Sequence, residues 1–260
     1  MLRWVRDEWG VFASSNKVRW VRQWVPFGAR TLGFGAVSIT AGPFTSGRAS
    51  TWAARRWSEV SSRGLGIEID ARGLEHLPSG SLVYAANHQS LIDILVLGAT
   101  LPEDFKWAAK RSLMNVPVIG WHLRLAGHVP VDRQAGRDAA VAVTEAFESV
   151  LQREQRLLVF PEGTRSADGV LKPFKPGAFH AAVRADRPVV PVAIHGTYSL
   201  LSRHEADMED HSERRVHVRI GPPLEADRTL PEADRIRELR DRTHGAVASM
   251  LDEIAREGGR

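Results

Sequence analysis

The chain contains no cysteine among its 260 residues. This absence excludes disulfide bonds, zinc sites built from thiolates and catalysis through a cysteine thioester, and it is consistent with a reducing compartment. Long hydrophobic runs are also missing. The longest uncharged stretch, residues 31–47, is interrupted by Gly33, Gly35, Gly42 and Pro43. A run of this length with these breakers lies at the lower limit for crossing a bilayer, so we expect a half-inserted helical hairpin rather than a transmembrane helix.

Two further signals are absent. No Gly-x-Ser-x-Gly elbow is present, so a serine hydrolase of that design is not indicated. A secretory signal is not expected either, since the apolar region begins near residue 31 rather than at the start. The length and the 43% hydrophobic fraction are typical of one large globular domain, or of one domain with an appendage.

Positive charge is concentrated at the N-terminus. Residues 1–57 hold nine Lys or Arg against Asp7 and Glu8, a net charge of +7, whereas the whole chain carries +4. The segment also holds six of the eight tryptophans: Trp4, Trp9, Trp20, Trp24, Trp52 and Trp57. Tryptophan beside arginine suits the headgroup layer of a membrane.

We therefore predict that residues 1–60 form an amphipathic helical segment that docks on an anionic membrane surface. The protein would be peripheral or monotopic, at the cytoplasmic face. The alternative is a helical hairpin packed on its own domain, because helical periodicity cannot distinguish lipid from a protein core. No nucleic-acid-binding module follows the basic segment, so we expect no nucleic-acid partner.

The remainder of the chain, residues 61–260, alternates strand-like and helix-like patterns. This alternation predicts an α/β fold in which helices flank a mostly parallel sheet. The last helix has an apolar stripe for packing, and Thr229 with Glu232 has the spacing of a capping box. Strands are expected at 67–70, 82–86, 105–109, 129–132, 157–160, 189–194 and 216–220, and helices at 91–99, 137–152, 177–185 and 231–257.

His88 and Asp93 are the strongest candidates for acid–base chemistry. In a continuous helix, residues five apart lie about 140° apart around the axis, so their side chains could not meet. They can meet if His88 lies in the turn after strand 82–86 and a helix begins near Ser90. Asp93 would then orient one ring nitrogen and leave the other as a general base. Ser90 and Asp93 also match a capping box, and the two roles are compatible because a carboxylate has two oxygens.

A second motif, Phe160-Pro-Glu-Gly-Thr-Arg165, follows a predicted buried strand. Gly163 permits close backbone approach, Thr164 offers a hydroxyl, and Arg165 presents a planar fork that suits a phosphate. Glu162 would need Arg165 or a substrate hydroxyl as its partner in so anionic a site. The alternative is a plain turn with a surface ion pair.

Further cations follow other strands. Lys110 directly follows the strand expected at 105–109, and Arg133 directly follows the strand expected at 129–132. Lys175, just before the helix expected at 177–185, is a weaker fourth candidate. With Arg165 these cations could hold a dianion, although solvated surface cations are the commoner outcome. No enzyme nucleophile accompanies them, and Ser90 is more simply a helix cap. The natural nucleophile is therefore a hydroxyl of the substrate, which predicts transfer of an activated group to an alcohol.

Four ordered blocks resemble the family of lysophospholipid acyltransferases. The likeness covers about residues 65–200, and the second block departs from the family pattern at Pro130, where an apolar or aromatic residue is usual. A segment at 110–117 with Gly120 also resembles one that recurs between the first two blocks. The four blocks are residues 87–93, with the His-x4-Asp motif, 127–133, 160–166 and 189–194.

The resemblance implies an enzyme of the 1-acylglycerol-3-phosphate O-acyltransferase type. Such an enzyme moves an acyl group from acyl-CoA or acyl-carrier protein directly to the hydroxyl of lysophosphatidate, giving phosphatidate. It implies no metal and no cofactor beyond the acyl donor. His88 would be the general base and Asp93 its orienting partner. The acceptor phosphate would be held by Lys110, Arg133, Glu162, Gly163, Thr164 and Arg165.

Three alternatives remain open from the sequence. The acceptor could be another lysophospholipid or a lyso-aminolipid, because the blocks define the chemistry better than the headgroup. A hydrolase would release free fatty acid instead of an ester. A catalytically inactive membrane-binding protein could keep the same scaffold, although loss of His88 or Asp93 would have favoured it and both are present.

Overall fold

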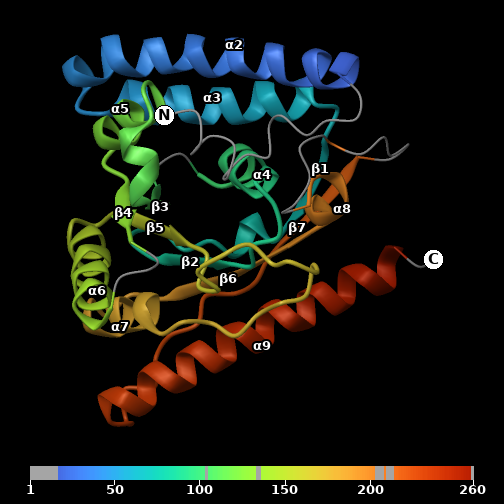
Figure 1. Cartoon of the computed structure of the whole chain (residues 1–260). Coiled ribbons are helices and arrows are strands. Elements are labelled where there is room, and N and C mark those ends of the chain that lie inside the picture. The colour runs from blue at the N-terminus through green and yellow to red at the C-terminus, as the bar shows by residue number, and fades with distance from the viewer. Residues whose placement is uncertain (1–16, 103–104, 133–135, 203–207, 209–213, 259–260) are drawn as a thin grey trace.

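The computed structural model describes residues 17–102, 105–132, 136–202, 208 and 214–258, and a seven-stranded sheet lies at its centre (Figure 1). The strand order is β1-β7-β6-β2-β5-β3-β4. Every strand predicted from the sequence is present, with each end within two residues of the prediction. The strands are β1 Glu68–Arg72, β2 Val83–Ala86, β3 Phe105–Lys110, β4 Val129–Val131, β5 Arg156–Val159, β6 Val189–His195 and β7 Arg215–Ile220.

The sheet is mostly parallel, which confirms the predicted fold class. Strands β6, β2, β5, β3 and β4 run parallel to one another, whereas β7 pairs antiparallel with β6 and carries β1 parallel to itself. The carboxyl ends of these five parallel strands therefore lie along one edge. In open α/β sheets, ligands bind at this edge.

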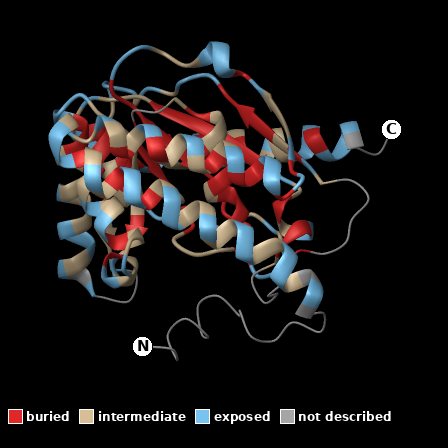
Figure 2. Ribbon diagram, turned by 90° about the horizontal axis from the view of Figure 1, so that it is seen from above, coloured by how far each residue is buried: buried red, intermediate tan, exposed pale blue. Residues whose placement is uncertain are grey.

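Helices cover both faces of the sheet (Figure 1). Both faces of strand β2 are therefore buried: Tyr84 and Ala86 belong to the core cluster on one face, and Val83 and Ala85 belong to the cluster on the other. A strand buried on both faces has a continuous apolar run instead of an alternating one. Figure 2 shows the buried strands between helices with exposed outer residues. The helices are α2 Lys17–Ala41, α3 Arg48–Gly64, α4 Ile92–Thr100, α5 Ile119–Leu125, α6 Arg137–Gln152, α7 Gly177–Arg184, α8 Thr197–Leu200 and α9 Glu232–Gly258, with short 3-10 turns at Gly42–Thr45, Leu74–His76 and Arg111–Asn115.

The N-terminal helices α2 and α3 form an antiparallel pair on one face of the molecule (Figure 1). Helix α3 packs on α4, and α2 packs on α5. Gly35 permits the second contact, because a Cβ at this position would lie 2.2 Å from Val118 Cγ1. Within the described residues, no helix is both long enough and apolar enough to cross a membrane.

The tryptophans of this segment face inward more than the sequence suggested. Trp24 and Trp57 pack against the core, and Trp57 Nε1 donates to Thr31 Oγ1 at 3.0 Å. Trp52, in contrast, is 46% exposed. The indole of Trp24 therefore fills space between the helix pair and the domain. Trp4 and Trp9 lie outside the described residues.

Helix α9 packs through its apolar stripe as predicted, since Ile236, Leu239, Val247 and Ile254 are buried. The capping box predicted at its start is absent. The backbone N–H and the hydroxyl of Thr229 both donate to Asp227 Oδ1, at 2.9 and 2.7 Å. A local aspartate therefore forms a turn with Thr229 three residues before the helix begins at Glu232.

Candidate active site

The turn after β2 is anchored to the neighbouring strands. Asn87 Nδ2 donates to the carbonyl of Ile194 at 2.9 Å, and the N–H of Ile194 donates to Asn87 Oδ1 at 2.7 Å. The next residue, His88, is held through its own backbone. Its N–H donates to Glu162 Oε1 at 2.7 Å, and its carbonyl accepts from the N–H of Ser166 at 2.7 Å. These bonds fix the first and third sequence blocks against each other.

His88 and Asp93 form the predicted contact. His88 Nδ1 lies 2.8 Å from Asp93 Oδ2, and the Asp93 side chain is fully buried. The same oxygen accepts from the N–H groups of Gln89 at 2.7 Å and Ser90 at 2.9 Å. Asp93 therefore orients the imidazole as expected, and the same oxygen also holds the backbone N–H groups of the turn that leads into α4, whose N-cap residue is Leu91. The Ser90 hydroxyl donates to the carbonyl of Leu201 at 2.6 Å and also accepts from a backbone N–H.

The second oxygen of Asp93 has a partner that the sequence reasoning missed. Thr197 Oγ1 donates to Asp93 Oδ1 at 2.6 Å, and Thr197 is fully buried. Thr197 follows β6 directly after Gly196, so it stands at the same sheet edge as His88. In the sequence, the only indication of this role was that Thr197 closely follows a predicted strand, as the other candidate site residues do.

The imidazole ring lies against an aromatic wall. His88 stacks on Phe160 with ring centroids 3.9 Å apart and an interplanar angle of 11°, and Phe160 lies 6.2 Å from Trp107. With Nδ1 donating to a carboxylate, Nε2 is the basic nitrogen of the neutral ring. Neither Phe160 nor Trp107 was predicted as a site residue, because apolar residues in strands are usually core.

The Glu162 carboxylate accepts hydrogen bonds from backbone N–H groups instead of pairing with a cationic side chain. Its Oε1 accepts from the N–H of His88, and its Oε2 accepts from the N–H of Lys172 at 3.3 Å. Burial raises the pKa of this carboxyl to about 7 in spite of those two bonds. The expected partners were Arg165 or a substrate hydroxyl, and backbone partners of this kind cannot be recognised from a sequence.

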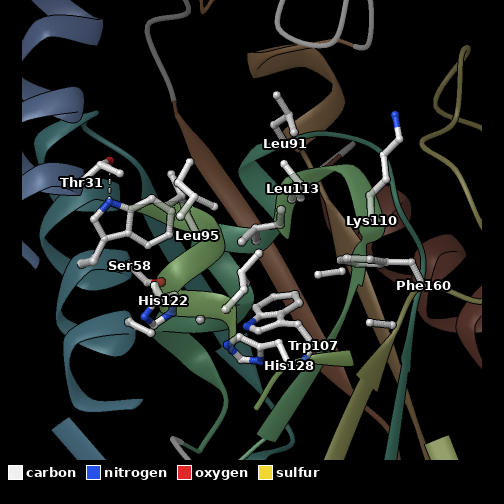
Figure 3. Close-up of a pocket in the computed structure, with 18 of the residues that line it drawn as sticks. Thr31, Ser58, Leu91, Leu95, Trp107, Lys110, Leu113, His122, His128 and Phe160 are labelled. Carbon is white, nitrogen blue, oxygen red and sulfur yellow. Dashed lines mark hydrogen bonds between the residues drawn. The ribbon is translucent and has the colours of Figure 1, made fainter. Parts of the chain in front are cut away.

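The turn that follows Glu162 faces a cavity. Gly163, with φ 76°, lines the cavity together with Thr164, Arg165 and His88. Lys110 reaches the same cavity from the end of β3, as Figure 3 shows. The structure thus brings together all but one of the predicted cations and the candidate base. Arg133 lies outside the described residues.

The cavity has a volume of about 950 Å³ and extends from His88 beneath the N-terminal helix pair. Its walls away from His88 are mainly apolar, with side chains from α2, α3, α4 and α5. Figure 3 shows Leu91, Leu95, Leu113, Trp107 and Phe160 among the side chains that line the cavity. Other apolar residues of the wall are Trp24, Phe27, Phe34, Trp57, Val118 and Ile119.

Two histidines add a polar but uncharged section to this wall. His128 Nδ1 accepts from the N–H of Trp107 at 2.9 Å, and His122 Nδ1 lies 2.8 Å from Ser38 Oγ. Burial lowers the pKa of His122 to about 4 and lowers the pKa of His128 well below its usual range. Both rings are therefore neutral at physiological pH.

Comparison with known proteins places this geometry in a family. A family model described as acyltransferase matches residues 68–195. Mouse 1-acyl-sn-glycerol-3-phosphate acyltransferase alpha is 34% identical over 194 residues, which cover 74% of this chain and 67% of the mouse protein. The chain belongs to this acyltransferase family.

Other relatives of this acyltransferase carry similar names. The 1-acyl-sn-glycerol-3-phosphate acyltransferase of Saccharomyces cerevisiae is 33% identical over 77% of this chain and 65% of the yeast protein. The chloroplastic BAT2 enzyme of Brassica napus is 36% identical over 64% of this chain and 48% of its own length. The matches thus span from about half to about two thirds of these relatives.

A solved structure shares the fold. The 1-acyl-sn-glycerophosphate (LPA) acyltransferase PlsC from Thermotoga maritima superposes with a TM-score of 0.67 at 24% sequence identity. The match covers 88% of this acyltransferase and 97% of that chain. It therefore includes helices outside the region of the family model as well as the sheet.

Proposed function

We propose that this acyltransferase moves a fatty acyl group from acyl-CoA or acyl-carrier protein to the free hydroxyl of lysophosphatidate, giving phosphatidate. The observation that carries the proposal is the contact between His88 and Asp93 at the mouth of an apolar cavity with Lys110 and Arg165 beside it. The names of the relatives support lysophosphatidate as the acceptor.

The chemistry follows from the dyad. The acceptor hydroxyl gives its proton to His88 Nε2 as its oxygen attacks the thioester carbonyl, and Asp93 stabilises the imidazolium that forms. The tetrahedral intermediate then collapses to the new ester, and the leaving thiolate takes the proton from His88. No acyl-enzyme forms, because the attacking oxygen belongs to the substrate and the nearby Ser90 hydroxyl donates to a backbone carbonyl. The proposal requires no metal and no cofactor beyond the acyl donor.

The acceptor phosphate lies, in this proposal, on the turn that contains Gly163, Thr164 and Arg165, with Lys110 and Arg133 completing the cation cluster. Arg165 supplies a bidentate fork and Lys110 a point charge. Glu162 acts differently from our expectation: it positions His88 through the backbone rather than binding substrate. The apolar cavity beneath the helix pair accommodates an acyl chain.

Membrane docking is assigned to residues 1–60, and catalysis to residues 61–260. Helix α2 turns an apolar stripe outward, and Phe44 at the tip of the helix pair is 89% exposed. Arg22, Arg48 and Arg56 are exposed nearby, which suits an anionic surface. We infer peripheral attachment to the cytoplasmic face of a membrane through the outer residues of the stripe, which are Val18, Val21, Val25 and Leu32.

One assay tests the proposed reaction. The purified full chain is incubated with either acyl-CoA or acyl-carrier protein and a panel of lyso-acceptors, and the products are identified by mass. Phosphatidate formed preferentially from lysophosphatidate supports the proposal. Preference for a different lysophospholipid or a lyso-aminolipid would change the acceptor. Release of free fatty acid would indicate a hydrolase, and no product from any pair would indicate an inactive membrane-binding protein.

A further inference from the structure

Lys175 is a cation at the cavity that the proposed function does not use. Its backbone N–H donates to the carbonyl of Pro161 at 2.8 Å, which ties residue 175 to the start of the 161–165 turn. The preceding residue, Phe174, is buried, stacks on Phe179 and meets His244 edge-on. The backbone at residue 175 is therefore fixed in place, while the lysine side chain is exposed at the mouth of the cavity.

The end of the Lys175 side chain lies directly over Gly163. A Cβ placed at Gly163 would come within 2.8 Å of Lys175 Nζ, 2.9 Å of Cε and 3.2 Å of Cδ. Any side chain at residue 163 would therefore displace the ammonium group. Gly163 also has a φ of 76°, which favours glycine on conformational grounds. The glycine thus serves the turn and makes room for the lysine.

Lys172 provides an internal contrast, because it is a nearby lysine with a structural contact. Its Nζ donates to the carbonyl of Arg165 at 3.3 Å, so it supports the turn backbone. For Lys175 Nζ, no acceptor is found among the residues that the structure describes. Of the described residues that line the cavity, five carry a guanidinium or ammonium group and Asp132 alone is acidic, and of the five Arg55 pairs with Glu59 at 3.0 Å. This excess of positive charge favours an anionic ligand.

We propose that Lys175 binds the phosphate of the acceptor together with Thr164 and Arg165, and that Gly163 allows its ammonium to reach that phosphate. The inference rests on the proposed function, because it takes the acceptor to be a phosphate monoester. Such a group offers three strong acceptor oxygens, enough for a guanidinium, a hydroxyl and an ammonium at once. The donor also contains phosphate, so the two sources must be separated by experiment.

Binding measurements separate them without requiring turnover. Full-length protein is titrated calorimetrically with hexanoyl-lysophosphatidate, with hexanoylglycerol, which lacks the phosphate, and with free coenzyme A. Lys175→Ala should weaken the binding of lysophosphatidate about tenfold, which corresponds to about 1.4 kcal/mol of binding free energy. The affinities for the other two ligands should not change. Lys175→Arg should retain most of the affinity. Arg153→Ala, which removes a surface charge on a residue outside the cavity lining, is the matched control.

The other possible results of these titrations distinguish a failure of the inference from a failure of the proposed function. Unchanged affinity for lysophosphatidate in Lys175→Ala overturns the inference, and so does a loss confined to coenzyme A. Affinity that depends on both the phosphate and Lys175, in protein that forms no phosphatidate, would sustain the inference while refuting the proposed function. Conversely, phosphatidate formation with an unchanged Lys175→Ala titration would refute only the inference.

A double-variant cycle tests the part played by Gly163. In the otherwise wild-type chain, Gly163→Ala should weaken the binding of lysophosphatidate, partly by displacing the Lys175 side chain. In a Lys175→Ala background this part of the loss is already present, so the combined loss should be smaller than the product of the two single losses. Multiplicative losses would show that Gly163 and Lys175 act separately, and would overturn the proposed role of the glycine.

Discussion

Thr197 donates its hydroxyl to Asp93 Oδ1 at 2.6 Å across 104 residues of sequence, while His88 takes the other oxygen of the same carboxylate. Both Thr197 and Asp93 are fully buried. The Asp93 carboxylate is therefore held from two sides, by Thr197 at the start of α8 and by the backbone before α4. The His88 imidazole hydrogen-bonds to a carboxylate whose orientation is already fixed.

Replacing Thr197 should consequently affect both stability and catalysis. Thr197→Val keeps the shape but leaves a buried carboxylate oxygen without its donor, at a cost of about 1–3 kcal/mol. We expect kcat to fall about tenfold, because the dyad loses part of its orientation. Thr197→Ser keeps the hydroxyl and is the control. Urea unfolding and initial rates measure the two effects, and wild-type values for Thr197→Val would show that the hydroxyl contributes neither.

Glu162 should make stability depend on pH. Burial raises its pKa from an ordinary 4.5 to about 7, so between these values the folded chain holds a proton that the unfolded chain releases. The free energy of unfolding should therefore fall as pH rises through this window, by at most about 1.4 kcal/mol per pH unit. Glu162→Gln cannot titrate and should lack this component. Identical pH dependence of unfolding in the two proteins would show that the pKa of Glu162 is not raised.

Arg165 and Lys110 should act on the acceptor rather than the donor. Replacing either with alanine should raise the Michaelis constant for lysophosphatidate about ten- to a hundredfold, since a charge-assisted contact is worth about 1.5–3 kcal/mol. Arg165→Lys should recover only part of the loss, because the planar fork is gone. The proposal is wrong on this point if the constant for acyl-CoA rises instead.

The outer face of α2 should control membrane binding. Val21→Glu with Val25→Glu places two carboxylates on the exposed stripe without touching the inward-facing tryptophans, and should reduce flotation with anionic liposomes. Val141→Glu, on an exposed position of α6, is the matched control. Because about 1 kcal/mol is expected per basic side chain near the surface, binding should also weaken with salt and with neutral lipid.

Undiminished flotation of the double variant would assign membrane contact to another surface. Deleting the helix pair would be a less direct test, because Trp24 and Trp57 pack on the core and their removal would uncover it.

Much of the fold could be predicted from the sequence because its signals are local. Apolar runs located every strand, and the contact between His88 and Asp93 needed only five residues of chain and a helix start. The turn at Gly163 was recognisable from its glycine after a buried strand. These features depend on neighbours in sequence, where backbone geometry restricts what can meet.

Other features depended on packing between distant segments. The partner of Asp93 at Thr197 comes from another strand end, and Glu162 bonds to backbone groups that every residue possesses. Periodicity placed Trp24 on a helix with apolar residues on more than one face, so it could not decide which face meets the core. At Thr229, two local hydrogen-bonding patterns competed, and the turn with Asp227 formed instead of the capping box.

The most direct test of the account is acyl transfer by folded His88→Ala protein. Initial rates of phosphatidate formation from lysophosphatidate and acyl donor are compared for wild type, His88→Ala and His180→Ala, a histidine of α7 outside the cavity lining. We expect wild-type rates for His180→Ala and a loss of about 10²- to 10⁴-fold for His88→Ala, because an alcohol at neutral pH needs a positioned base. Near-wild-type turnover by folded His88→Ala protein would contradict it.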